Sequence, residues 1–271
     1  MAFTLSHMAA ALPFYRYRRW INFEALLLGT MLPDLPYFLN SSQAVSEQSH
    51  SWPGLLSYCL PWGLGLFMLW HWLLKPAAIA LLQPWLAITA LASPHEFQQW
   101  GKSGITIILG LLLGSITHLI WDGITHPDGF IAERIFWLQV SIRLDYLGDM
   151  SLARLLQYAS STMALVYLGW FIKTKAKQVT WQKVAFANIP IIVLKSWVSL
   201  LIISIVCAGS LFCAVQAMLK WHSLMFHNTY LFLAKVLVGL LQGAIGLFVI
   251  YALAYQLLYW FFYARSRYTR K

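Results

Sequence analysis

The chain has 271 residues, of which 60% are hydrophobic and only 10% are charged, and its net charge is +10. Soluble domains carry about 45–50% apolar and about 25% charged residues, so the composition excludes a disordered chain and disfavours a soluble enzyme. The basic residues lie between apolar runs, which indicates orientation in a membrane and no nucleic-acid partner. We therefore expect an integral membrane protein surrounded by lipid.

Five apolar runs predict membrane-spanning helices, because a spanning helix needs about 20 mostly apolar residues. In chain order these runs are 54–74, 104–125, 155–172, 197–219 and 236–260. Residues 21–39 are also apolar but are interrupted by Pro33 and Pro36, and the run 77–92 is short. Either segment can be re-entrant or interfacial. The expected fold is all-α, a polytopic transmembrane bundle of five or six spans that forms a single membrane domain over 1–271.

Two basic clusters predict the orientation of this bundle. The first follows the run 155–172 and the second ends the chain; their members are Lys173, Lys175, Lys177, Lys183, Arg265, Arg267, Arg270 and Lys271. The positive-inside rule places both clusters, and hence the C-terminus, in the cytoplasm of what we expect to be a bacterial inner membrane. Residues 1–160 hold all nine acids and would carry the site, whereas 161–271 would form basic-flanked anchoring helices.

Three ionisable residues follow one another at intervals of four in the run S-I-T-H-L-I-W-D-G-I-T-H-P-D-G. His118, Asp122 and His126 therefore share one face of a helix. Neighbours in this series are ~6 Å apart along the axis and can share a metal ion, but His118 and His126 are ~12 Å apart. Either Asp122 bridges two metals, or one His supports a ligand from behind. The alternative is a polar seam that joins helices by hydrogen bonds.

Other donors in the first half of the chain extend this set. His7 lies in F-T-L-S-H, Asp34 in G-T-M-L-P-D-L-P-Y-F and His50 in Q-S-H-S. Four His and two Asp suit zinc or another first-row divalent ion, and not calcium or magnesium. Asp122 is a candidate catalytic carboxylate as well as a ligand, and Glu133, which follows His126 closely, is the candidate general base.

Several sequence blocks resemble the domain-of-unknown-function 4184 family of bacterial membrane proteins. They are F-T-L-S-H-x-A-A-x-L-P, G-T-M-L-P-D-L-P-Y-F, S-H-S-W-P-G-L-L-S-Y-C-L-P, T-H-L-I-W-D-G-I-T-H-P-D-G and L-L-Q-Y-A-S-S, in that order from residue 3 to 161. The resemblance implies that the six His and Asp residues belong to one family pattern. The arrangement is also similar to membrane-bound metal-dependent hydrolases. Where we expect the family to read Q-H-x-S, this chain has Tyr158 in place of the His, which weakens the case for catalysis.

Two functions from different classes fit these residues. The first is a membrane-embedded metal-dependent hydrolase, acting on an ester or phosphoester of a membrane lipid or a lipid-linked molecule. The second is a non-catalytic membrane protein, such as a transporter, a metal-binding component or an assembly factor, that uses the same His and Asp cluster. A hydrolase needs a tightly held ion with an open coordination position, whereas an ion pathway needs exchangeable binding.

The N-terminus separates the five-span from the six-span alternative. A helix that crosses over 21–39 would hold Arg16–Arg19 at the cytoplasmic surface, about 30 Å of hydrocarbon away from the other ligands. If His7 joins the cluster, the segment 1–20 must instead return to it. We predict this convergence, with at least four of the six side chains within about 8 Å, the reach of a metal site of one or two ions.

Overall fold

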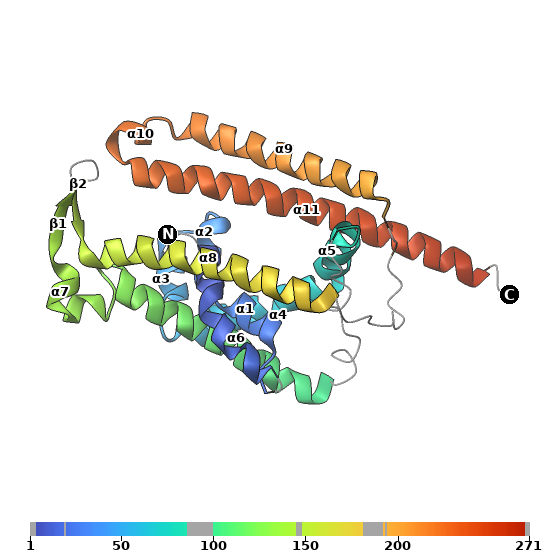
Figure 1. Ribbon diagram of the computed structural model, residues 1–271, viewed down its shortest axis with the longest axis horizontal. Helices are drawn as coiled ribbons and strands as arrows, with labels where there is room; N and C mark the ends of the chain where they lie inside the picture. Colours follow the sequence, from blue (N-terminus) through green and yellow to red (C-terminus); the bar gives the residue numbers. More distant parts are fainter. Residues whose placement is uncertain are drawn as a thin grey trace. The chain divides into compact units, whose positions relative to one another are not determined.

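The computed structural model describes residues 4–18, 20–85, 100–144, 148–180, 192 and 194–268 (Figure 1). Within these ranges the chain is helical, apart from a short antiparallel pair of strands, β1 (Ser141–Leu144) and β2 (Gly148–Ser151). The predicted all-α class is therefore confirmed.

Five helical segments among the described residues are long and apolar enough to cross a membrane. The first, Leu55–Leu82, is continuous through η2 (Leu55–Cys59), α4 (Leu60–Leu69), η3 (Trp70–Leu74) and α5 (Lys75–Leu82). The others lie in α6 (Trp100–Thr125), α8 (Leu152–Thr180), α9 (Ser196–Lys220) and α11 (Thr229–Tyr268). Each contains or overlaps one of the five predicted runs. Their outer faces carry exposed aliphatic side chains, among them Val166, Leu211 and Leu257, which suits contact with lipid.

Residues 21–39 are not one of these spans. They form α1 (Phe23–Gly29), a turn, and α2 (Leu35–Phe38), with seven and four residues respectively. At 1.5 Å per residue, α1 covers only about 10 Å of the roughly 30 Å hydrocarbon core. The six-span alternative is therefore wrong for the described part of the chain, because the prolines end the helix as expected. Of the run 77–92, the first six residues extend the first span, and 86–92 lie outside the described residues.

The first basic cluster lies largely on a helix. These lysines follow the apolar run 155–172 in the sequence, and α8 continues beyond that run to Thr180 and carries the first three of them. Lys183 lies outside the described residues, as do Arg270 and Lys271 at the end of the chain.

The chain divides into two compact units, Met1–Phe67 with Gln99–Lys173, and Met68–Gln98 with Thr174–Lys271. All six predicted ligands belong to the first unit. The single-domain organisation, with site-bearing residues 1–160 and an anchor over 161–271, stays a prediction.

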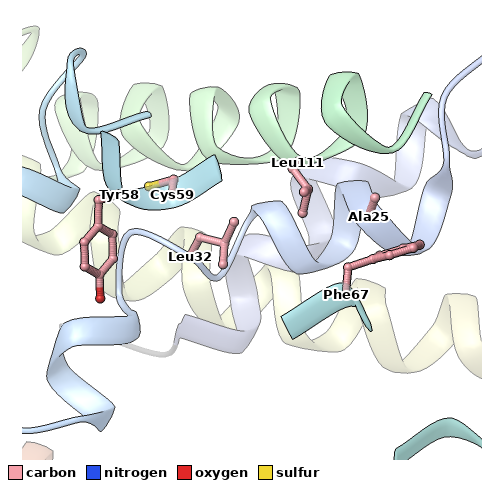
Figure 2. Close-up of a cluster of buried hydrophobic side chains, with 6 residues drawn as sticks. All are labelled: Ala25, Leu32, Tyr58, Cys59, Phe67 and Leu111. Carbon is pink, nitrogen blue, oxygen red and sulfur yellow. The ribbon is translucent and has the colours of Figure 1, made fainter. Parts of the chain in front are cut away.

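The core of the first unit lies where α1 packs against α6. A buried cluster joins residues of α1, of the turn after it, of the first span and of α6: Ala25, Leu32, Tyr58, Cys59, Phe67 and Leu111 (Figure 2). Two glycines make this approach close. A Cβ atom on Gly114 would lie 2.3 Å from the Leu26 carbonyl oxygen, and one on Gly29 would lie 2.4 Å from the Leu111 carbonyl oxygen. Small residues of this kind let membrane helices pack with their backbones in contact.

Short elements complete the first unit around this core. They are η1 (Thr4–Tyr17) and α3 (Gln43–Ser49) before the first span, and η6 (Ala132–Arg134), α7 (Phe136–Gln139) and the β1–β2 pair between α6 and α8. The hydroxyl of Ser49 donates to the carbonyl oxygen of Pro33 at 2.7 Å. This bond holds the end of α3 against the turn that precedes α2, and so brings His50 beside Asp34.

The second unit is built on two long helices that run side by side, α9 and α11 (Figure 1). The short helix α10 (Leu224–His227) lies between them in the chain. The hydroxyl of Tyr251 donates to the Ala77 carbonyl oxygen at 3.1 Å, and the amide of Gln256 donates to that of Trp72 at 2.9 Å. These bonds tie α11 to the segment η3–α5 within this unit.

Candidate metal centre

Four of the predicted ligands form one tight group. One ligand atom from each of Asp34, His50, His118 and Asp122 lies within 4.8 Å of the other three. Asp34 comes from the turn before α2, His50 ends α3, and the other two lie one turn apart on α6. The structure therefore meets the expectation that at least four of the six side chains converge. That these residues bind a metal stays a prediction.

The spacing of these atoms is that of ligands around one ion. Asp34 Oδ1 lies 3.4 Å from His50 Nε2 and 3.7 Å from His118 Nε2. Asp122 Oδ2 lies 3.2 Å from His118 Nε2 and 3.9 Å from His50 Nε2. Hydrogen bonds from N to O usually measure about 2.7–3.2 Å, so three of the four contacts are too long. Tetrahedral ligands at about 2.0–2.1 Å from zinc are about 3.3 Å apart.

Backbone carbonyls decide which nitrogen of two histidines faces this group. Nδ1 of His118 lies 2.7 Å from the carbonyl oxygen of Thr30, and Nδ1 of His50 lies 2.9 Å from that of Ser46. A carbonyl only accepts, so Nδ1 carries the proton in both rings and Nε2 presents its lone pair. His118 Nε2 is buried, and the polar atoms that face it among the described residues are Asp122 Oδ2 at 3.2 Å and Asp34 Oδ1 at 3.7 Å.

Asp34 is held by a hydroxyl from the N-terminal segment. Although it precedes α2, its side chain makes no capping bond. Instead, the Thr4 hydroxyl on η1 donates to Asp34 Oδ2 at 2.6 Å. The other oxygen, Oδ1, is thereby turned toward the two imidazoles.

The remaining two predicted ligands lie on the other side of Asp122. His7 Nε2 is 3.4 Å and His126 Nδ1 is 3.5 Å from Asp122 Oδ1. The ring of His7 stacks on that of His118, with centroids 3.9 Å apart and planes 24° from parallel. All six predicted His and Asp side chains are thus in one place, and the segment 4–17 returns to the cluster as the five-span alternative requires.

The pKa values of His7 and Asp34 favour the forms of these two side chains that bind a metal. Burial, together with the neighbouring His118, lowers the pKa of His7 to about 3, so its imidazole stays neutral at physiological pH. Burial opposes ionisation of Asp34, but the imidazoles of His118 and His50 outweigh it, and the pKa of Asp34 lies well below its ordinary range. Neutral imidazole and ionised carboxylate are the forms that bind metals.

Glu133 and Tyr158 stand apart from this group. Glu133 lies on η6 with an exposed side chain, and it is not among the residues whose ligand atoms meet. Its role as general base stays a prediction. On α8, Gln157 contacts the site, because its Nε2 lies 2.8 Å from His126 Nε2. Tyr158, the departure from the expected family pattern, is its half-buried neighbour.

Sequence reasoning missed the residues that support the ligands. Thr30 and Ser46 act through backbone carbonyls, so their side chains carried no signal. Thr4 also carried no signal, because nothing in the sequence distinguishes it from any other threonine near a chain end. Gln157 did carry a signal, because an amide on an apolar helix needs a partner.

This fold and site define a class of protein: a helical membrane protein with a buried cluster of four histidines and two aspartates. The chain belongs to the family described as Domain of unknown function (DUF4184), whose model matches residues 1–254. No curated protein and no solved structure matched the chain. Any activity must therefore be argued from the site itself.

Proposed function

We propose that the protein is a membrane-embedded metal-dependent hydrolase that acts on an ester or phosphoester of a lipid or lipid-linked molecule. The observation that carries the proposal is the four-donor group, in which ligand atoms of Asp34, His50, His118 and Asp122 lie within 4.8 Å of one another. Two carboxylates and two imidazoles from the turn before α2, from α3 and from α6 meet in this group. Grouping them in a largely buried place is costly unless a cation lies between them.

The donor set favours zinc or another first-row divalent ion. Two imidazole nitrogens and two carboxylate oxygens suit such an ion, whereas magnesium and calcium prefer sites built from oxygen alone. A bound divalent ion of this type supplies two functions in hydrolysis: it lowers the pKa of a bound water and polarises the ester or phosphoester.

The residues of the chain orient the donors and limit access to them. The His118 and Asp34 side chains are 0% and 4% exposed, which keeps this side of the group dry. The His50 and Asp122 side chains are 22% and 17% exposed, so a substrate would approach from their side.

Exposed aromatic rings in the segments that follow His50 and His126 support a lipid substrate. Trp52, two residues after His50, packs edge-on against Phe130 with ring centroids 5.8 Å apart. Phe136 and Trp137 on α7 are 75% and 72% exposed. Aromatic rings of this kind sit at the level of lipid headgroups in membrane proteins. A substrate carried in the membrane would therefore meet the cluster by lateral diffusion.

The test is metal content together with hydrolysis by the full-length protein purified in mild detergent. We expect about one or two equivalents of zinc or manganese, and chelator-sensitive release of products from vesicles of phosphatidylethanolamine and phosphatidylglycerol. Asp34→Asn and His118→Gln should lose both properties. His227→Gln, a histidine on α10 outside the cluster, is the matched control and should keep both. Protein without metal would contradict the proposal.

A closed group of four protein donors also favours a second function. Structural metal sites are four-coordinate and closed, whereas catalytic ones keep a position free. In this alternative the protein holds an ion without using it, as a metal-binding component or assembly factor would. Tightly bound metal with no release from any vesicle or soluble ester would support this function and contradict the hydrolase.

A further inference from the structure

We propose that Asp122 joins two metal positions, and that His7 and His126 build the second position on its other carboxylate oxygen. The inference rests on the proposed metal centre, because both positions share Asp122. It adds an ion that the four-donor group does not require.

The two oxygens of Asp122 face separate sets of nitrogen atoms. Oδ2 lies 3.2 Å from His118 Nε2 in the first group, while Oδ1 lies 3.4 Å from His7 Nε2 and 3.5 Å from His126 Nδ1. The two contacts of Oδ1 are longer than the about 2.7–3.2 Å of ordinary N–H···O bonds. They match the roughly 3.3 Å between two tetrahedral ligands of zinc. Each imidazole therefore lies at a distance from Oδ1 that suits two ligands of one cation better than a hydrogen bond.

The neighbours of His7 leave its metal-facing atom for this role. His7 is buried at 4% exposure, and Nδ1 has no hydrogen-bond partner in the described part of the chain, so Nε2 is the atom of the ring with polar neighbours. Its ring is held in place by stacking on His118 and by an edge contact with Trp121. A ring fixed in this way presents Nε2 to Asp122 at little cost in conformational entropy.

The second position has fewer protein donors than the first. It has three protein donors, whereas the first has four, and three donors with one free position are the pattern of catalytic zinc. The side chain of His126 is 23% exposed, close to the 22% of His50. A ligand from outside the protein, such as inorganic phosphate or a phosphoester oxygen, would therefore reach both positions from the side that His50, Asp122 and His126 share.

Gln157 is the positioning residue for His126. Its amide nitrogen lies 2.8 Å from His126 Nε2, and its amide oxygen is buried with no partner among the described residues. Turning the amide over exchanges its nitrogen and oxygen, and the oxygen then accepts from Nε2–H. Nδ1 of His126, which lies 3.3 Å from the backbone carbonyl oxygen of Asp122 and 3.5 Å from its Oδ1, would then present a lone pair in place of a proton. Binding of a second ion would select this arrangement.

Metal stoichiometry of the full-length protein tests the second position. Purified protein loaded with zinc and desalted should hold two ions, and His7→Gln and His126→Gln should each hold one. The ion that remains in the first group shows that these variants are folded, and His222→Gln, an exposed histidine, should hold two. Wild-type protein with one ion that both variants keep would overturn the second position and leave the proposed centre standing. Wild-type protein with no ion would overturn both, and loss of both ions in either variant would show that the positions are not separate.

Substitutions of Gln157 test its role independently of activity. Gln157→Leu removes the acceptor and should weaken binding of the second zinc ion about 10–100-fold in a titration against a chromogenic chelator. In Gln157→Glu the ionised carboxylate can only accept a hydrogen bond from His126 Nε2–H, so this variant should restore the affinity for the second zinc ion. A merely structural role of Gln157 would not predict this recovery. Equal zinc affinity in all three proteins, or loss in the Glu variant as large as in the Leu variant, would overturn the role of Gln157.

Discussion

Nδ1 of His118 lies 2.7 Å from the carbonyl oxygen of Thr30, a residue 88 positions earlier in the chain. Thr30 ends α1, and His118 lies on α6. The bond forms because these two helices pack closely, and it decides which nitrogen of His118 faces Asp34 and Asp122. The packing of α1 against α6 therefore sets the orientation of the His118 imidazole.

Substitution of Gly114, which is not itself a ligand, should disturb the cluster. A Cβ atom there would lie 2.3 Å from the Leu26 carbonyl oxygen and 2.7 Å from the Thr30 backbone nitrogen, and backbone atoms have little freedom to move. Overpacking of this kind costs about 1–3 kcal/mol. We expect Gly114→Ala to lower the midpoint of thermal unfolding in detergent and to reduce bound zinc.

Gly104→Ala is the matched control for this prediction. Gly104 lies on the same helix, and nothing is within 4 Å of the position that its Cβ would take. Exchange of Gly for Ala in a helix is favourable by up to about 1 kcal/mol. Unchanged stability and zinc content in Gly114→Ala would show that α1 does not orient His118 as the distances indicate.

Removal of the Thr4 hydroxyl should weaken the metal centre. Thr4 donates to Asp34 Oδ2 at 2.6 Å and leaves Oδ1 facing the imidazoles. Loss of such a supporting bond typically costs about 10–100-fold in metal affinity, so we expect that effect in Thr4→Val, measured by zinc titration. Thr4→Ser keeps the hydroxyl and should bind like the wild type. Thr162→Val removes an exposed hydroxyl that bonds only along its own helix and should have no effect.

Metal removal should destabilise the protein. Without a cation, the carboxylates of Asp34 and Asp122 face each other across a buried group of imidazoles. A ligand at 100 to 1,000 times its Kd stabilises the folded state by about 2.7–4.1 kcal/mol. Addition of a chelator to zinc-loaded protein should therefore lower the unfolding midpoint, and return of zinc should restore it. The same midpoint with and without chelator, in protein whose zinc is shown to be gone, would contradict the proposed centre.

Glu133→Gln tests whether Glu133 is the general base, as the sequence predicted. A general base contributes about 100–10,000-fold to a rate, so loss of that magnitude in kcat would support the sequence prediction. Because Glu133 is exposed on η6 and outside the group of ligand atoms, we expect the rate of product release to stay unchanged. Asp128→Asn, a nearby acid in the same connection, serves as the comparison.

The orientation in the membrane stays a prediction that a reporter fusion can test. Five spans place the C-terminus on the side opposite to His50 and to the connection between α6 and α8. The positive-inside rule makes the C-terminal side cytoplasmic. A reporter that is active only in the cytoplasm should therefore work when fused after Lys271, and one that is active only outside it should work when placed in the connection after His126. The reverse result at both sites would invert the orientation.

The sequence alone determined the elements that depend on local pattern. Runs of about 20 apolar residues predicted the five spans, because such a length is what a helix needs to cross the hydrocarbon core. The interval of four placed His118, Asp122 and His126 on one face of α6, since that spacing follows from helix geometry. The residue types of the cluster were also readable, because ionisable groups in apolar segments are costly unless they have a use.

Tertiary structure decided how these residues meet. Whether 21–39 crosses the membrane, and so whether His7 reaches Asp122, depended on contacts between segments far apart in the chain. The division of partners between the two oxygens of Asp122 followed from the close approach of α1, η1 and α6. The support from the Thr30 and Ser46 carbonyls was not readable from residue types, because every residue carries a carbonyl and only packing decides which one a histidine meets.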